Sequence, residues 1–120
     1  MIARIFFIKC ALLNIHQGER IVQAKDLNRI VSGLKKPAIL AGDLNAIPDS
    51  RPIEILLKRW TITSEMPAEP TYPSDNPVRK LDYILYHPED RWEVVDWEDI
   101  EEKLASDHRP YVVTLQLVLN

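Results

Sequence analysis

Residues 38–45, Ala-Ile-Leu-Ala-Gly-Asp-Leu-Asn, decide the fold class of this chain. The four apolar residues at the start follow the breakers Lys35-Lys36-Pro37, so they predict a short, buried strand. Asp43 and Asn45 come at the end of that strand, where α/β folds place the polar groups that carry out chemistry. This stretch therefore predicts an α/β fold with candidate site residues at the end of a buried strand.

Two helical patterns flank the strand. Between residues 20 and 34 the apolar positions recur at helical spacing, and Gly33 with the breakers after it ends the pattern. A second helix is predicted from Ser50, as its N-terminal cap, to about Arg59, with Pro52 in its first turn. Both helices can therefore pack on the sheet that contains the strand.

The rest of the chain predicts further strands and a long loop. Residues 61–76 are rich in Pro, Thr, Ser and acidic residues, which favours a surface loop, and residues 99–104 suggest an acidic helical turn. This order predicts an α/β fold, with a mixed β-sheet and helices packed on it, in a single domain of residues 1–120. Further strands are expected at residues 1–13, 81–86, 92–96 and 111–119.

Composition narrows the possible functions. A chain of 120 residues with 46% hydrophobic and 28% charged residues is typical of one small globular domain. Its net charge of −3 argues against a non-specific DNA-binding module, although a nuclease can carry a local basic cleft. The single cysteine excludes an internal disulfide. Because Arg4 and Lys9 interrupt the first apolar run, we expect neither a signal peptide nor a membrane span, and we expect a cytoplasmic protein.

Asp43 and Asn45 suit hydrolytic chemistry. If the extended backbone continues through Asn45, both side chains lie on the same side of it. The carboxylate can then orient and deprotonate a water molecule, while the amide donates a hydrogen bond to a phosphoryl oxygen. Gly-Asp and Asn are also common turn residues, so an ordinary turn after a strand is the alternative.

A second polar segment, Ser106-Asp107-His108-Arg109-Pro110, precedes the last predicted strand. An imidazole with a pKa near neutrality can polarise a phosphoryl oxygen or protonate a leaving group, which makes His108 a candidate. Asp107 can bind a hard cation through oxygen, as Mg²⁺ requires. The alternative is a helix cap and a solvated loop.

Two further polar residues lie at strand ends. Asp82 begins an apolar run, where a buried carboxylate without a partner is costly, and a hydrogen bond to His108 would relieve that cost. Asp82 is therefore a candidate to orient His108, and an exposed aspartate at a strand edge is the alternative. His16 follows the first apolar run and could contact a phosphate oxygen, although an ordinary surface histidine fits the same pattern.

These motifs, in this order, resemble the endonuclease/exonuclease/phosphatase superfamily of magnesium-dependent phosphodiesterases and phosphatases. The resemblance runs from His16 to the end and looks nearest to the bacterial branch described as metal-dependent hydrolases. It implies a four-layer α/β sandwich of two packed β-sheets with helices outside. The motifs are a strand that ends near His16, Gly42-Asp43-Leu44-Asn45, Arg79-Lys80-Leu81-Asp82-Tyr83-Ile84 and Ser106-Asp107-His108-Arg109-Pro110.

The resemblance also implies a role for each matching residue. Asp43 would activate the attacking water, and Asn45 would hold the phosphoryl group in the transition state. Asp82 would orient His108, which would contact the scissile phosphate with support from His16. Asp107 would bind the metal, Mg²⁺ or Mn²⁺. The implied substrate is a phosphoester, such as nucleic acid, an inositol phosphate or a phospholipid headgroup.

One departure from the family pattern shapes the functional hypotheses. Family members carry an Asn and a metal-binding Glu in an N-terminal half, whereas residues 1–13 contain no Asp, Glu or Asn. The chain therefore resembles a truncated domain, about half of the four-layer sandwich, and we expect it to self-associate through an exposed sheet face. The leading hypothesis is a metal-dependent phosphoester hydrolase. The alternative is a non-catalytic remnant or assembly module of the same fold, and a nucleic-acid-binding module is least favoured.

Overall fold

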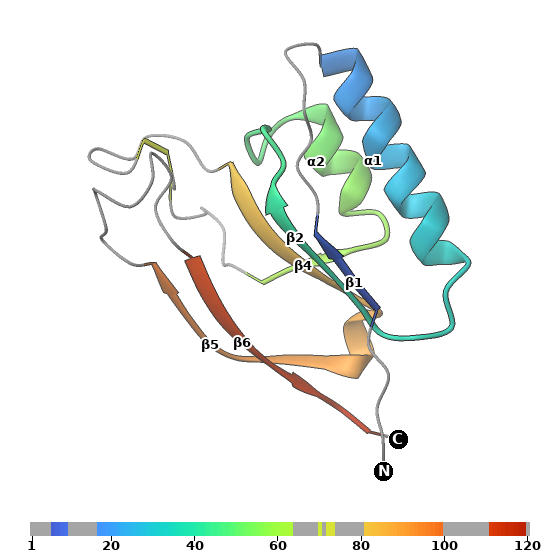
Figure 1. Cartoon of the computed structure of the whole chain (residues 1–120), viewed down its shortest axis with the longest axis vertical. Coiled ribbons are helices and arrows are strands. Elements are labelled where there is room, and N and C mark those ends of the chain that lie inside the picture. The colour runs from blue at the N-terminus through green and yellow to red at the C-terminus, as the bar shows by residue number, and fades with distance from the viewer. Residues whose placement is uncertain are drawn as a thin grey trace.

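The computed structural model describes residues 6–9, 17–63, 70, 72–73, 81–99 and 111–119. In this part of the chain, two helices cover one side of a four-stranded sheet, and a separate two-stranded sheet lies on its other side (Figure 1). The elements in chain order are β1 (Phe6–Lys9), α1 (Gln17–Ser32), β2 (Ala38–Asp43), α2 (Arg51–Leu56), β3 (Thr61–Ile62), β4 (Asp82–His87), a 3-10 turn (Glu89–Arg91), β5 (Trp92–Asp99) and β6 (Tyr111–Leu117).

The four-stranded sheet has the strand order β1-β2-β4-β3. β1 and β2 are parallel and are joined through α1, while β4 runs antiparallel to both β2 and β3. The second sheet is the antiparallel pair β5 and β6, with a register shift between Val94 and Asp96. The predicted α/β class with a mixed sheet is therefore confirmed.

The main core lies between the helices and the four-stranded sheet. Leu40 of β2 and Leu85 of β4 are register partners, and both are fully buried. Complete burial of a leucine side chain stabilises a fold by about 1.5–3 kcal/mol, so this layer contributes strongly to stability. The helices supply Ala24, Leu27, Val31, Ile53, Ile55 and Leu56 to the same cluster.

Strand alternation divides the residues of β2 between two environments. Ala38 and Leu40 face the helices and are fully buried, whereas Ile39, Ala41 and Asp43 lie on the other face and are half-buried. The strand also extends two residues beyond the predicted Ala41, so Asp43 is its last residue rather than part of the following loop. A candidate site residue is thereby attached to the sheet itself.

The side chains of β6 alternate between two environments. Val113, Leu115 and Leu117 are half-buried, while Val112 and Gln116 are exposed. The apolar face of the β5–β6 sheet is thus less completely covered than the helix-facing core. Among the described residues, no helix is both long enough and apolar enough to cross a membrane.

α2 begins where the sequence predicted, but several other predicted boundaries were wrong. Ser50 is the N-terminal cap residue of α2, although its hydroxyl donates a hydrogen bond to the Ile47 carbonyl at 2.6 Å instead of accepting one from a helix N–H. α2 ends at Leu56 instead of near Arg59, and the predicted loop begins with strand β3. Asp99 belongs to β5 and not to a helical turn, while residues 1–5 and 100–110 lie outside the described residues.

Candidate active site

Asp43 and Asp82 lie opposite each other on neighbouring strands. Asp43 ends β2, Asp82 begins β4, and the two are register partners in the antiparallel ladder. The next pair along, Leu44 and Leu81, is joined by a backbone hydrogen bond of 2.9 Å. Because hydrogen-bonded and non-hydrogen-bonded pairs alternate, Asp43 and Asp82 form a non-hydrogen-bonded pair, in which side chains approach most closely. The sheet therefore brings two carboxylates together on one face.

This pairing has an electrostatic consequence. Like charges directly opposite each other on a sheet are destabilising unless other groups compensate them. Carboxylate oxygens are hard ligands, and Mg²⁺ is commonly held by one or two carboxylates together with waters and substrate oxygens. The donor chemistry of Asp43 and Asp82 thus fits a divalent cation, although Asp82 was predicted to orient a histidine.

The loop after β2 fixes the Asp43 side chain. The Asn45 backbone N–H donates a hydrogen bond to Asp43 Oδ1 at 2.7 Å, which closes a tight turn. Two backbone angles make this turn possible, since Gly42 has φ 141° and Asn45 has φ 48°. Both values lie in the left-handed region, where Gly and then Asn are the tolerated residues. Gly42, Asp43 and Asn45 of the Gly-Asp-Leu-Asn motif therefore each have a part in forming this turn.

The premise of an extended backbone through Asn45 was wrong. The strand ends at Asp43, and the positive φ of Asn45 turns the chain away. The alternative of a turn after the strand describes the backbone correctly. A carboxylate can accept several hydrogen bonds at once, so the bond from Asn45 orients Asp43 without using its full capacity. A turn and a catalytic position are compatible here.

Tyr83 anchors the same loop and was not identified from the sequence. Its side chain is 1% exposed, and its hydroxyl donates a hydrogen bond of 2.6 Å to the Ala46 carbonyl. Burial raises the pKa of the Tyr83 phenol above its usual range, and the nearby charges of Asp82 and then Asp49 raise it further. The phenol therefore stays protonated and keeps its donor role. The sequence did offer one indication: Tyr83 directly follows Asp82 in a predicted strand, so its side chain points to the opposite, core-facing side of the sheet.

A family model described as the Endonuclease/Exonuclease/phosphatase family matches residues 9–108 of the chain. The chain belongs to the endonuclease/exonuclease/phosphatase family. The resemblance drawn from the four sequence motifs is therefore confirmed. The matched range contains all six predicted site residues, which are His16, Asp43, Asn45, Asp82, Asp107 and His108.

Solved structures of endonuclease/exonuclease/phosphatase proteins share this fold. A family protein from Bacteroides thetaiotaomicron matches with a TM-score of 0.78 and 17% identity, over 94% of this chain and 50% of its own. The mannosyl-6-phosphatase of the same species gives 0.76 and 16%, over 92% and 51%. The human Nocturnin catalytic domain with a bound sulfate anion gives 0.65 and 20%, over 93% and 46%. This chain spans about half the length of these structures. Among curated proteins, no sequence matches it significantly.

Three of the site residues expected from the endonuclease/exonuclease/phosphatase pattern lie outside the described residues, namely His16, Asp107 and His108. Their contacts with Asp43 and Asp82 therefore stay predictions. Within the described part of the chain, no three His, Cys, Asp or Glu residues gather as a metal-binding group. The structure brings Asp43, Asn45 and Asp82 together, and the roles of all six residues are proposals.

The two tryptophans whose side chains are described serve packing. Trp60 is 2% exposed and Trp92 is 7% exposed, and Trp92 Nε1 donates a hydrogen bond of 3.2 Å to the His87 carbonyl. The His87 ring lies edge-on to Trp60, with 6.1 Å between ring centroids. Neither tryptophan presents an open face to a nucleic-acid base, so these residues belong to the scaffold of the family fold.

Proposed function

We propose that this chain is the C-terminal part of a divalent-metal-dependent phosphoester hydrolase, in which water attacks phosphorus. The observation that carries the proposal is the register pairing of Asp43 with Asp82 at the end of two strands. Two carboxylates held together on one face can orient a water molecule and balance the charge of a cation at the same time. A single aspartate could do either of these but is less suited to do both at the same time.

Each residue of the chain has a defined task in this proposal. Asp43, held by the Asn45 N–H, orients the attacking water and accepts its proton. The Asn45 amide donates a hydrogen bond to a phosphoryl oxygen as negative charge develops there. Asp82 orients the His108 imidazole, and His108 contacts the scissile phosphate with His16 in support.

The metal ligand in this proposal is Asp107, and the paired carboxylates of Asp43 and Asp82 are candidates to supply further oxygens or to bind ligand waters. When bound, Mg²⁺ or Mn²⁺ supplies charge stabilisation at the phosphoryl oxygens. Oxygen donors of this kind suit these hard cations better than they suit zinc or copper. Removal of divalent metal with a chelator is therefore expected to abolish turnover.

The substrate class is a phosphate ester. Two structural neighbours support it, because one is named a mannosyl-6-phosphatase and the other carries a sulfate, a tetrahedral anion of the same shape as phosphate. Nucleic acid, an inositol phosphate and a phospholipid headgroup are the candidates within this class. Selectivity among them is expected to come from the loops around the site and not from Asp43 or Asp82.

A second candidate function is a non-catalytic remnant or assembly module of the same fold. The observation that favours it is length, because the chain spans about half of each solved relative. A complete site would then need a partner. We propose that a second copy supplies it by association through the half-buried apolar face of β5 and β6.

Hydrolysis of bis(p-nitrophenyl) phosphate with Mn²⁺ or Mg²⁺ tests the function. Asp43→Asn keeps an oxygen that can accept the Asn45 N–H but cannot act as a base, so kcat should fall by roughly 10²–10⁴-fold. Asp26→Asn is the matched control, because Asp26 is paired with Arg29 on the outer side of α1. His108→Ala should also abolish turnover. Equal activity of wild type and Asp43→Asn would contradict the proposal, and no turnover by folded wild type would favour the remnant.

A further inference from the structure

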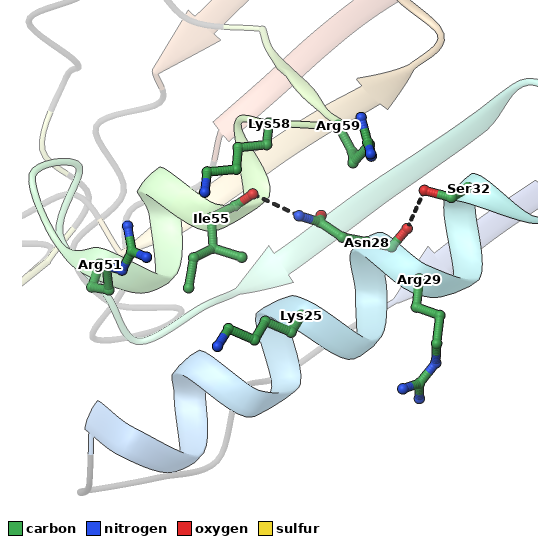
Figure 2. A pocket seen from close by; sticks show the side chains of 8 residues that line it. All are labelled: Lys25, Asn28, Arg29, Ser32, Arg51, Ile55, Lys58 and Arg59. Atoms are coloured by element: carbon green, nitrogen blue, oxygen red, sulfur yellow. Dashed lines mark hydrogen bonds between the residues drawn. The ribbon is translucent and has the colours of Figure 1, made fainter.

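A pocket lies between α1 and α2, on the outer side of the helices (Figure 2). Its volume is about 360 Å³, within the range of small-molecule sites. The core-facing residues of both helices pack against the sheet, whereas Asp43 and Asp82 lie on the sheet's opposite face. The helices and the sheet therefore separate this pocket from the candidate active site.

The pocket is strongly basic. Five of the chain's fifteen Lys and Arg residues line it, although the chain as a whole carries a net charge of −3. Such a concentration in an acidic protein creates a local positive potential that the average charge conceals. The basic residues are Lys25 and Arg29 from α1, Arg51 from α2, and Lys58 and Arg59 from the turn after it.

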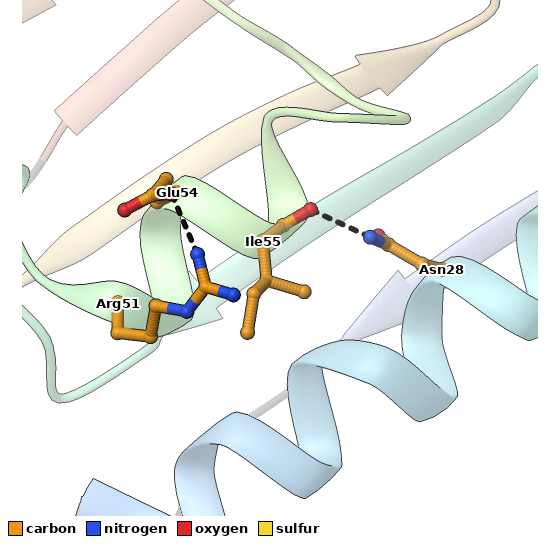
Figure 3. A network of polar contacts seen from close by, with 4 residues as sticks. All are labelled: Asn28, Arg51, Glu54 and Ile55. Atoms are coloured by element: carbon orange, nitrogen blue, oxygen red, sulfur yellow. Dashed lines mark hydrogen bonds and ion pairs between the residues drawn. The ribbon is translucent and has the colours of Figure 1, made fainter.

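Two of these five cations already have acidic partners. Arg29 lies 2.8 Å from Asp26, and Figure 2 shows its side chain extending away from α2. Arg51 lies 2.6 Å from Glu54 (Figure 3). Within the described part of the chain, Lys25, Lys58 and Arg59 make no ion pair. The side chain of Lys25 reaches into the space between the helices, so uncompensated charge concentrates inside the pocket.

The walls of the pocket are held at a fixed spacing. Asn28 of α1 donates a hydrogen bond from Nδ2 to the Ile55 carbonyl of α2 at 2.6 Å (Figure 3). Ser32 Oγ donates to the Asn28 carbonyl at 2.8 Å on the same wall. Because a hydrogen bond joins the two helices, the cleft between them is largely pre-formed. Ligand binding then costs little conformational entropy of the protein.

We propose that this pocket binds a small molecule that carries two or more phosphate groups, at a site separate from Asp43 and Asp82. Arg59 offers a planar fork that fits phosphate oxygens, and Lys25 and Lys58 offer point charges. Nucleic acid fits less well, because the cations line a compact cleft instead of a stripe, and the lining holds no aromatic residue on which a base could stack. The ligand class is therefore a compact polyphosphate.

Titration calorimetry with inorganic tripolyphosphate tests this inference. The titration is run in EDTA, so that metal at the other site contributes nothing. Wild type should bind tripolyphosphate, and added salt should weaken the binding. The double variant Lys25→Gln/Lys58→Gln should bind at least about tenfold more weakly, since both lysines line the pocket and neither has an acidic partner among the described residues. Lys35→Gln/Lys36→Gln is the matched control, because it removes two exposed lysines outside the pocket.

Each other outcome would overturn the inference. If wild type gives no heat of binding at low salt, the pocket does not bind tripolyphosphate. If both double variants weaken the binding equally, the binding reflects general charge attraction and not this pocket. Tighter binding of a single-stranded DNA of about 20 nucleotides, lost in Lys25→Gln/Lys58→Gln, would assign the pocket to nucleic acid. The pocket variant should keep full hydrolysis of bis(p-nitrophenyl) phosphate, which separates this site from the proposed function. Arg59→Gln is a second probe if the double variant unfolds.

Discussion

Single residues around Asp43 combine backbone geometry with chemistry. Gly42 gives the chain a φ that other residues rarely adopt, and Asn45 both tolerates a positive φ and offers its N–H to the carboxylate. A side chain fixed in this way needs little reorganisation before it acts. The turn that Gly42 and Asn45 form is therefore also what orients Asp43 for its proposed role.

The first prediction concerns Gly42→Ala. A Cβ at φ 141° is strained, so this change should lower the free energy of unfolding by about 1–3 kcal/mol. Urea unfolding followed by circular dichroism measures it. Gly18→Ala is the control, because a Cβ there meets no atom within 4 Å and α1 should become slightly more stable. Unchanged stability of Gly42→Ala would contradict the strain argument.

A second prediction concerns the buried hydroxyl of Tyr83. Tyr83→Phe removes the hydrogen bond to Ala46 and leaves a buried carbonyl with one partner fewer, which should cost about 1–2 kcal/mol at neutral pH. The unfolding midpoint in urea reports the loss. A variant as stable as wild type would show that this bond contributes nothing to the fold.

The second prediction extends to pH, because the pKa of Tyr83 is raised in the folded protein. Because burial and the charges of Asp82 and Asp49 raise the pKa in the folded state, the stabilisation is complete below the unfolded pKa of about 10. It is lost as the pH rises above that value, since only the unfolded chain then ionises readily. Above about pH 10, the free energy of unfolding of wild type should therefore fall more steeply with pH than that of Tyr83→Phe. Parallel curves for the two proteins would contradict the assignment.

At the level of elements, regular patterns were predictable and short irregular contacts were not. The apolar spacing of residues 20–34 predicted α1, and the apolar residues 38–41 before Gly42 predicted β2. β3 was missed because two residues carry no periodicity, and tertiary contacts form it instead. Thr63, just beyond β3, donates hydrogen bonds to the Ile84 carbonyl from both its N–H and its hydroxyl. No local signal in the sequence could indicate these partners.

Two adjacent leucines at the end of α2 give a third prediction. Leu56 is fully buried against the sheet, while Leu57 is 39% exposed. Leu56→Ala should destabilise the protein by about 2–5 kcal/mol because it leaves a cavity in the core. Leu57→Ala should cost less than about 1 kcal/mol. Thermal unfolding of the pair measures the difference, and similar losses would mean that α2 packs differently.

At the level of the whole molecule, the two faces of the four-stranded sheet are unequally covered. In β2 and β4 the helix-facing Ala38, Leu40 and Leu85 are fully buried, while Ile39, Ala41 and Ile84 on the other face are half-buried. The class of fold followed from the order of patterns along the chain. His16, Asp107 and His108 lie outside the described residues, so their places beside Asp43 and Asp82 stay predictions.

A fourth prediction concerns self-association. Leu115 lies on the half-buried face of β6, and Gln116 lies on its exposed face. If a second copy covers the apolar face, wild type should show a concentration-dependent mass in sedimentation velocity. Leu115→Lys should weaken that association, since a buried charge without a partner is costly, and Gln116→Lys should leave it unchanged. A wild type that stays monomeric at high concentration and melts cooperatively would contradict this proposal.

The pairing of Asp43 with Asp82 has a consequence for the order of folding events. The two residues are distant in the chain, so their carboxylates come together only after β2 and β4 have closed a long loop in the correct register. A slip of one residue would turn one of the carboxylates toward the helices. Affinity for a divalent cation should therefore return late during refolding, as a kinetic marker that the central strands have found their native alignment.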